Sequence, residues 1–506
     1  MLWACLFLPS LPLDVFARGH SPADAAKPFA ITTGGRTPRI VDANAAACDA
    51  GVHREQLVSA SFALSPNLVL RERSPEAESA ALETVASWAT QFTPVVALAP
   101  PDAVLVEIGG SLRLFGGLSS LTTRLSHGAR DLGYDARLAL APTSAAALLF
   151  ARAATEPKAS PPAFPRAWLD TLAPLPLSLA EADPAAVAML EAAGIETFGQ
   201  AFALPRAALA RRAGEDFVAL LDRVRGLSPE LRPAFVPPPR YAGKLDLPAP
   251  VADVDALAFA VNRLVLELAG WLAGRGLGVA EMSLALAHER YVGITTGVAA
   301  TTVSFALAAP AREPAHLIGV LRERLARVVL PAPVEAITLA TVATAPLSGR
   351  NLGLLPGDDA TATVPLIDRL RARLGETAVT LVTAHAEHRP ERAWRERKIE
   401  FESGNGGRGK RKKAPLAADS AGIVPRPVWL LAEPEPLGNS LGHRLEAQPW
   451  VLRDGPERIE SGWWDGADVR RDYFIAENPR GETVWIYRDH RYGIDDGEWF
   501  LHGVFA

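Results

Sequence analysis

The sequence predicts a multidomain protein of the α+β class, and three observations support this. At 506 residues the chain is too long for a single hydrophobic core. Short apolar stretches with strand-like alternation lie between alanine-rich stretches with helical periodicity. Two proline-rich stretches, 157–165 and 232–241, divide the chain into successive compact regions.

Composition excludes several other classes of protein. Apolar residues make up 49% and charged residues 22%, which is an ordinary globular balance, and the net charge of -5 excludes an avid, strongly basic nucleic-acid binder. The two cysteines, Cys5 and Cys48, form no CxxC pair, which argues against structural zinc and for a reducing, cytoplasmic location. The apolar start of the chain lacks a positive n-region, so it is predicted to be a core strand and turn rather than a signal peptide. No run of about 18 uncharged apolar residues is present, so no membrane span is expected.

The first domain is expected over residues 1–160. Its predicted strands are Leu2–Leu8, Pro28–Thr32, Arg39–Asp42, Val104–Ile108 and Ala136–Ala141, and its predicted helices are Pro75–Gln91, Leu118–Leu132 and Thr143–Ala154. Ser74 is a candidate N-cap, with Pro75 at the first helical position. This pattern predicts helices packed against one sheet.

A helical region follows over residues 161–235. Within it, "LEAAGIETFGQAFALPRAALARRAG" ends one helix at Gly194 and begins another after a short turn. Such a hairpin is either a simple helix pair or a phosphate-binding unit, because turn glycines let backbone N–H groups approach a phosphate closely.

The third region, 236–346, is predicted to be a small α+β domain. Its expected helices are Asp253–Ala273 and Ala315–Val328, and its expected strands are Val279–His288, Thr301–Leu307 and Glu335–Ala343. Nine basic and nine acidic residues balance between Arg240 and Pro346, so this domain alone should bind DNA weakly.

The remaining regions, 347–425 and 426–506, are predicted to be a linker and an aromatic-rich β-module. Five basic residues lie in Arg408–Lys413, where they form either a solvated tether or a phosphate contact. The stretch His385–Lys398 holds two histidines with no third ligand at metal spacing, so a solvated basic helix or loop is expected there. The aromatic residues after 426 have strand-like spacing and are expected to form a core rather than a ligand cage.

One stretch, "LAPPDAVLVEIGGSLRLFGG", raises the question of a metal site. It alternates like a buried strand and carries two carboxylates, Asp102 and Glu107. A catalytic metal centre usually needs two or three carboxylates that converge on one point.

The order of these parts resembles the Y-family of translesion DNA polymerases: palm and fingers, a helix-hairpin-helix thumb, a linker and a little finger. The resemblance covers about two-thirds of the chain, from Leu2 to Ala345. It rests on "DANAAACDAGVHREQLVSASFALSPNLVL" for the fingers, "QFTPVVALAPPDAVLVEIGG" for the palm strands and "AGIETFGQAFALPRAAL" for the thumb hairpin. Within the family, the tail ending "WFLHGVFA" is similar to the extension of a subfamily of polymerase-like subunits from damage-induced (SOS) mutagenesis complexes.

The resemblance implies an active site whose carboxylates are mostly lost. Active members carry acidic residues on the first strand, where this sequence places Leu6 and Leu8 with Phe7 between them. On the later strand, the four positions of the Ser-Ile-Asp-Glu pattern hold Pro100, Pro101, Asp102 and Ala103. One carboxylate of three remains, and a lone carboxylate holds Mg²⁺ poorly. No metal and no cofactor are therefore expected, with Asp102 and Glu107 as surface or turn carboxylates.

The residues that would hold a nucleoside triphosphate are also replaced. By the same resemblance, Ala45 and Cys48 stand where active members have a tyrosine and an arginine, and Ser144 replaces a phosphate-binding lysine. Leu11 occupies the position that would exclude ribonucleotides.

Two sets of residues remain as candidate binding sites. The residues expected to contact DNA are Gly194, Ile195, Thr197, Gly199, Arg206, Arg211 and Arg212. The pentapeptide Asn351-Leu352-Gly353-Leu354-Leu355 resembles the clamp-binding peptide of bacterial polymerases, Gln-Leu-x-Leu-Phe. Leu352, Leu354 and Leu355 would enter a hydrophobic groove of the β sliding clamp, and the side-chain amide of Asn351 would form a hydrogen bond at its rim.

The expected function is a non-catalytic adaptor in translesion synthesis. The resemblance implies the sliding clamp, an accessory mutagenesis protein of the ImuA type, an error-prone C-family replicative polymerase and damaged primer-template DNA as partners. Two alternatives stay open. One is an active translesion polymerase with Asp102, Glu107 and Asp14 as its only metal ligands, and the other is an α/β binding protein without a DNA role.

Overall fold

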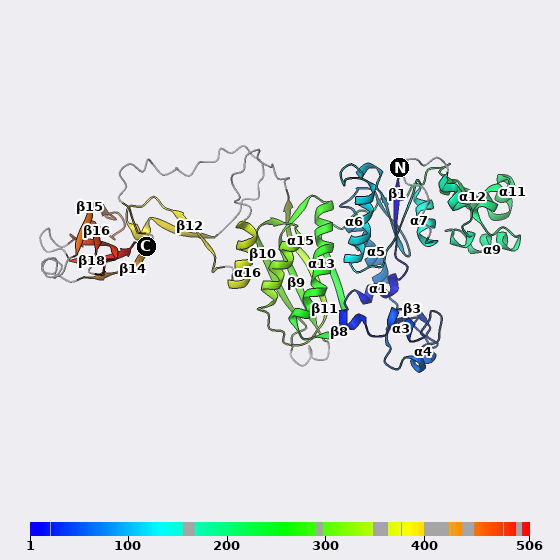
Figure 1. Cartoon of the computed structure of the whole chain (residues 1–506), viewed down its shortest axis with the longest axis horizontal. Coiled ribbons are helices and arrows are strands. Elements are labelled where there is room, and N and C mark those ends of the chain that lie inside the picture. Colours follow the sequence, from blue (N-terminus) through cyan, green and yellow to red (C-terminus); the bar gives the residue numbers. More distant parts are fainter. Residues whose placement is uncertain are drawn as a thin grey trace. The chain divides into compact units, whose positions relative to one another are not determined.

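The computed structural model describes residues 1–20, 22–154, 167–289, 297–347, 363–375, 377–398, 425–427, 429–437, 450–478, 480–491 and 498–505. Residue contacts divide the chain into two compact units, one over Met1–Gly375 and one formed by the described residues from 377 onward (Figure 1).

The palm-like part of the first unit is a four-stranded sheet in the order β5-β6-β1-β7. Its strands are β1 (Trp3–Phe7), β5 (Val96–Ala99), β6 (Ala103–Glu107) and β7 (Arg137–Ala141), and its helices are α1 (Leu11–Ala17), α5 (Pro75–Ala89), α6 (Leu118–Asp131) and α7 (Ser144–Arg152), with a 3-10 turn η1 (Gly109–Ser111). Helices α5 and α6 cover one face of the sheet and α7 covers the other (Figure 1). The hydroxyl groups of Ser74 and Thr143 cap α5 and α7 by accepting the N–H groups of Ala77 and Ala146. The predicted N-cap at Ser74 is confirmed.

The fingers-like part is a smaller sheet in the order β3-β2-β4. Its elements are α2 (Pro22–Ala25), β2 (Phe29–Thr32), β3 (Ile40–Ala43), α3 (Ala45–Asp49), α4 (Val58–Leu64) and β4 (Val69–Glu72). Asn44 begins α3, because its side-chain oxygen accepts the N–H groups of both Ala47 and Phe29 at 3.0 Å.

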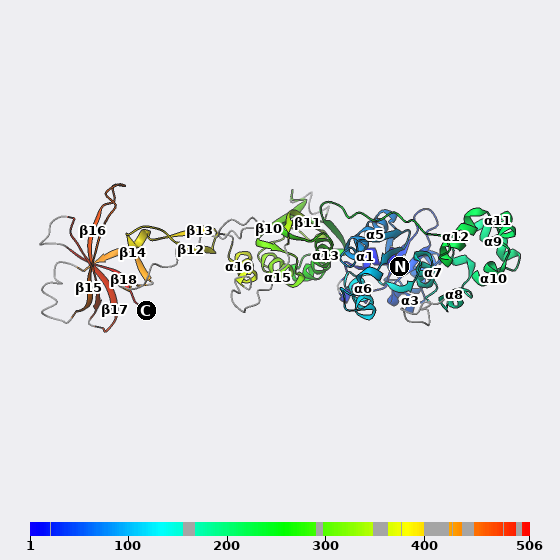
Figure 2. The same cartoon turned by 90° about the horizontal axis from the view of Figure 1, so that it is seen from above.

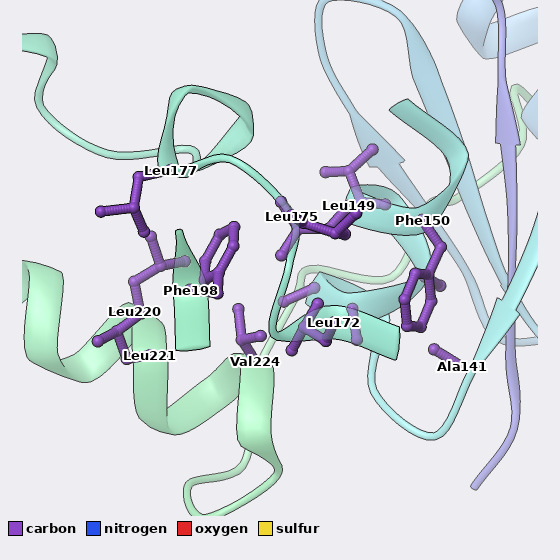
Figure 3. Close-up of a cluster of buried hydrophobic side chains, with 14 of the residues drawn as sticks. Ala141, Leu149, Phe150, Leu172, Leu175, Leu177, Phe198, Leu220, Leu221 and Val224 are labelled. Carbon is purple, nitrogen blue, oxygen red and sulfur yellow. The ribbon is translucent and has the colours of Figure 1, made fainter. Parts of the chain in front are cut away.

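The thumb-like part consists of short helices. They are α8 (Ala167–Leu172), η2 (Leu177–Leu179), α9 (Pro184–Ala192), α10 (Phe198–Ala203), α11 (Arg206–Ala213) and α12 (Glu215–Arg225). Their apolar side chains share one core with α7 and the adjoining face of the palm-like sheet. Figure 3 shows Leu149 and Phe150 of α7 on one side of this cluster, with Phe198 and Val224 on the other.

The little-finger-like part is a four-stranded antiparallel sheet in the order β10-β9-β11-β8. Its elements are β8 (Ala242–Val251), α13 (Val254–Gly274), β9 (Leu277–His288), β10 (Ala300–Ala311), α15 (Pro314–Leu325) and β11 (Val334–Pro346). Helices α13 and α15 pack on one face of the sheet (Figure 2). A further helix, α16 (Thr363–Leu374), packs against α15 and β10, although the sequence predicted a linker there.

Helix α13 is the core helix of this part. Within the part of the chain that the structure describes, only residues 256–274 are long and apolar enough to cross a membrane, and 61% of that window is buried in the fold. Its Glu267 is buried and pairs with Arg18 of α1, whose guanidinium also donates to the carbonyl of Leu132 at 2.8 Å. Burial and this ion pair fix α13 against the palm-like part.

The second unit contains a hairpin and a five-stranded antiparallel sheet in the order β14-β18-β17-β16-β15. Its elements are β12 (Thr380–Ala384), η4 (Pro390–Arg392), β13 (Trp394–Lys398), β14 (Trp429–Pro436), β15 (Val451–Ser461), β16 (Val469–Glu477), β17 (Thr483–Asp489) and β18 (Trp499–Val504). Tyr473 and Trp485 stack with ring centroids 4.0 Å apart and are both 1% exposed, so these aromatic rings form a core.

Candidate functional site: the carboxylates of the palm-like sheet

The register between β1 and β6 decides which residues face α7. Leu6 pairs with Val104 and Phe7 pairs with Ala103, and the N–H of Leu8 donates to the carbonyl of Asp102 at 2.8 Å. Since side chains alternate across a sheet, Phe7 lies on the same face as Ala103, while Leu6 and Leu8 lie on the opposite face. Both leucines are fully buried in the core beneath α5 and α6. Leu6 and Leu8, which the resemblance aligns with lost acidic positions, are therefore core residues, and Phe7 lies on the face of Ala103.

Asp102 lies in the turn between β5 and β6, after a cis Pro100–Pro101 peptide bond. Its carboxylate accepts a hydrogen bond from the guanidinium of Arg152, at the end of α7, over 3.1 Å. The Asp102 side chain is 30% exposed and that of Arg152 is 16% exposed. The surviving carboxylate therefore already has a cationic partner.

Arg152 belongs to a chain of charges that extends into the thumb-like part and the segment after it. The same nitrogen of Arg152 is 3.4 Å from Glu181, whose other oxygen is 3.2 Å from Arg232. Arg232 is also 2.9 Å from Glu230, which accepts the hydroxyl of Ser144. Residues from four segments are thus joined by this chain of charges.

A small cavity lies beside this charge chain. The cavity lined by Arg152, Glu181 and apolar residues of α7, α10 and α12 has a volume of about 10 Å³, close to the minimum for one water molecule. Cys5 is buried beneath the same face, and burial raises the pKa of its thiol well above the usual value.

The other two candidate carboxylates have structural partners of their own. Glu107 accepts the N–H groups of Leu2 at 3.0 Å and Gly109 at 3.1 Å. Asp14 accepts the N–H of Asp135 at 3.0 Å, and burial raises the pKa of Asp14 to about 7. Across the described ranges, no group of three or more His, Cys, Asp or Glu residues could hold a metal ion. The residues present therefore do not fit the pair of Mg²⁺ ions that active Y-family polymerases use.

The residues at the four replaced nucleotide-binding positions offer no cationic side chain to a phosphate. Ala45 and Cys48 lie one turn apart on α3, and both are exposed. Ser144 is buried at 2% exposure, and Leu11 is buried at the start of α1. An alanine side chain has no polar atom, and the hydroxyl of Ser144 is bound to Glu230.

The thumb hairpin uses its own backbone N–H groups. Gly194 and Ile195 donate to carbonyls at the end of α9, and Phe198 and Gly199 donate to the carbonyls of Leu175 and Ala173. The remaining N–H groups, those of Glu196, Thr197 and Gln200, donate to side-chain oxygens of the capping box formed by Thr197 and Gln200. Every N–H from residue 194 to residue 200 has a partner inside the thumb, so the hairpin geometry favours a structural role over phosphate binding.

The thumb arginines remain available as side-chain contacts. Arg206, Arg211 and Arg212 all lie on α11 and are exposed. Arg206 pairs with Asp222 of α12, and Arg211 donates to the carbonyl of Ala207 at 3.2 Å. Contact with DNA through these side chains stays a prediction.

Two predicted features fall outside the described residues. They are the clamp-like peptide Asn351–Leu355 and the basic run Arg408–Lys413.

Arg389 is a buried structural residue in a stretch that the sequence predicted to be solvated. Arg389 is 2% exposed and donates to Glu387 at 2.7 Å and to both oxygens of Asp465 at 2.7 and 3.0 Å. These hydrogen bonds hold the pKa of each carboxylate at about 2. Its partner Asp465 is 76 residues away, so local sequence carried no signal for this role.

Comparison with known proteins finds one family model and two curated relatives. Residues 16–152 match the model of the impB/mucB/samB family. The chain is similar to Protein ImuB of Caulobacter vibrioides, in strains NA1000 / CB15N and ATCC 19089 / CIP 103742 / CB 15. Identity to each is 29% over an alignment of 480 residues that covers 90% of this chain and 100% of the relative. These matches confirm the resemblance expected from the sequence.

Solved structures are also matched, with low overall superposition. The Y-family DNA polymerase chimera Dbh-Dpo4(243-245)-Dbh is 14% identical with a TM-score of 0.38, and DinB from Sulfolobus solfataricus is 14% identical with a TM-score of 0.36. Each match covers 67% of this chain and 98% of the other chain.

Proposed function

We propose that this chain is a non-catalytic, polymerase-like adaptor in damage-induced mutagenesis. It links the sliding clamp, damaged primer-template DNA and an error-prone C-family polymerase, together with an accessory protein of the ImuA type. The observation that carries the proposal is the ion pair between Asp102 and Arg152, because it occupies the one carboxylate that the resemblance aligns with a metal ligand. The similarity to Protein ImuB over 90% of the chain supports the same role.

Binding would be divided among several weak contacts in this role. The little-finger-like part has balanced charge, so its attraction to phosphate is small and sensitive to salt. The pentapeptide Asn351–Leu355 supplies the clamp contact, and Arg206, Arg211 and Arg212 supply contacts to DNA. Linking such sites in one chain raises their effective concentration without a single strong interface.

The alternative, an active translesion polymerase with unusual ligands, needs Asp102, Glu107 and Asp14 to share a metal. Each of these carboxylates has a different partner in the structure: Arg152 for Asp102, the N–H groups of Leu2 and Gly109 for Glu107, and the N–H of Asp135 for Asp14. This separation of partners favours the adaptor.

Primer extension tests the absence of catalysis. The full chain is incubated with primer-template DNA, nucleotides and Mg²⁺ or Mn²⁺, with an active Y-family polymerase as positive control. No extension is expected. Metal-dependent extension that disappears in Asp102→Ala would overturn the adaptor and favour the alternative.

Clamp binding is measured separately by surface plasmon resonance with the purified clamp. The double variant Leu352→Ala plus Leu354→Ala is expected to lose binding. The matched control is Leu227→Ala plus Leu231→Ala, because these leucines are 66% and 94% exposed elsewhere in the chain. Equal loss in both double variants, or unchanged binding in the first, contradicts the assignment of the peptide.

A further inference from the structure

Helix α16 is anchored to the little-finger-like part through one of its faces. The buried carboxylate of Asp368 accepts the N–H of Ala308 at 2.7 Å and lies 3.0 Å from Nε2 of His316. One turn further along, Ala372 is buried in the same core. These contacts fix the orientation of the helix and thereby decide which side chains point outward.

The opposite face of α16 carries an exposed row of leucines. Leu366, Leu370 and Leu374 are 56%, 36% and 56% exposed. Because residues four apart lie on one side of a helix, the three side chains form a continuous apolar stripe. Within the part of the chain that the structure describes, no element covers this stripe, and ordered exposed apolar patches commonly mark interaction sites.

Arginines lie beside the stripe on α16 and on the neighbouring helix α15. Arg369 and Arg373 are exposed on the same helix, and α15 lies against it (Figures 1 and 2). Six arginines fall in residues 314–330 and 363–375, namely Arg322, Arg324, Arg327, Arg369, Arg371 and Arg373. The same residues include two carboxylates, those of Glu323 and Asp368, and Asp368 is buried. The surface formed by α15 and α16 is therefore both cationic and aliphatic.

A groove lies next to this surface. A cavity of about 410 Å³ is lined by Val254, Ala258, Arg322, Glu323, Leu325 and Ala326. The guanidinium of Arg369 is 3.4 Å from the carboxylate of Glu323, which joins the rim of the groove to α16. The groove has room for aliphatic side chains between α13 and α15.

We propose that the leucine stripe of α16, Leu366–Leu370–Leu374, and the adjacent groove bind an amphipathic helix of a partner protein. That helix would carry aliphatic side chains flanked by carboxylates, because these complement the leucines and the arginines together. If the same surface of a second copy of this chain bound here, the six arginines of one copy would face the six of the other, and the two surfaces would repel each other. Nucleic acid would satisfy the arginines and leave the leucines without apolar partners. This proposed binding to the leucine stripe of α16 does not require the clamp peptide or the adaptor role, so it can be tested separately from them.

Two synthetic helical peptides provide the test, measured by fluorescence anisotropy with the full chain. Both carry leucines at helical spacing, and one has flanking glutamates where the other has flanking lysines. The glutamate peptide is expected to bind at least about tenfold more tightly than the lysine peptide. The variant Leu366→Ser plus Leu370→Ser is expected to weaken binding of the glutamate peptide by at least about tenfold.

The matched control is Leu381→Ser plus Val382→Ser, which replaces two exposed apolar residues of β12 (47% and 65% exposed) and should leave binding unchanged. Every substituted side chain is exposed, so both double variants are expected to fold. Unchanged circular dichroism spectra would exclude misfolding. Equal binding of both peptides, no binding of the glutamate peptide, or insensitivity to the leucine substitutions would overturn the proposal. The proposal would also be overturned if duplex DNA displaces the glutamate peptide and binds the leucine double variant as tightly as it binds the wild type.

Discussion

The substitution Asp102→Asn tests whether the carboxylate of Asp102 is a structural partner of Arg152 or a metal ligand. In the structure, Asp102 accepts one hydrogen bond from Arg152, and both side chains are partly exposed. Hydrogen bonds to charged groups contribute about 1.5–3 kcal/mol when buried, whereas exposed ion pairs contribute about 0–1 kcal/mol. For this intermediate exposure, the substitution should lower the free energy of unfolding by about 1 kcal/mol.

Mg²⁺ should have no effect on the wild type under this interpretation. A working site with a Kd of about 0.1 mM would stabilise the fold by about 2.7 kcal/mol in about 10 mM Mg²⁺. Since the residues on this face do not fit a metal, the expected stabilisation is close to zero, with or without the Asp102→Asn substitution.

Hydrogen exchange measured by mass spectrometry on the full chain checks both expectations. Peptides that cover β5 and β6 report the protection of this face, with and without MgCl2. The matched control is Asp131→Asn, because Asp131 is an exposed carboxylate at the end of α6. Strong slowing of exchange by Mg²⁺ in the wild type, absent in Asp102→Asn, would refute the reasoning and restore the metal site.

Three further predictions concern the core, the pH dependence of stability and DNA. Leu6→Asp should cost at least about 4 kcal/mol, because it removes a fully buried side chain and buries a carboxylate. Leu6→Met should cost less than about 1.5 kcal/mol in the same urea titration, and equal midpoints would contradict this. The raised pKa of Asp14, about 7, means that the folded chain keeps a proton that the unfolded chain releases near pH 4. The free energy of unfolding should therefore fall by up to about 4 kcal/mol as the pH rises from 4 to 7, and a similar fall in Asp14→Asn would disprove the cause. Replacing Arg206, Arg211 and Arg212 by alanine should reduce the slope of log K for DNA against log salt by about 2–3, whereas an unchanged slope would place DNA contact elsewhere.

Local sequence predicted much of the secondary structure because periodicity and capping act over a few residues. Ser74 caps α5 as expected, and the predicted helix Asp253–Ala273 is observed as Val254–Gly274. Helix α16 was missed, since its sequence contains Pro365 and follows a peptide predicted to be exposed. Its docking depends on contacts between Asp368 and residues more than fifty positions earlier, which no local pattern contains.

The sequence by itself predicted that most carboxylates of the active-site pattern it resembles are replaced, since that prediction needs only the residue types at a few aligned positions. The tertiary structure decided what replaced them. In the fold, Arg152 donates a hydrogen bond to Asp102, which is 50 residues away in the sequence. Phe7 rather than Leu6 lies on the same face of the sheet as Ala103. Every N–H of the thumb hairpin donates to a partner within the thumb. These outcomes depend on strand register and on packing between distant segments. Residue type fixes what chemistry a side chain can perform, whereas its partner in space fixes whether that chemistry is free to occur.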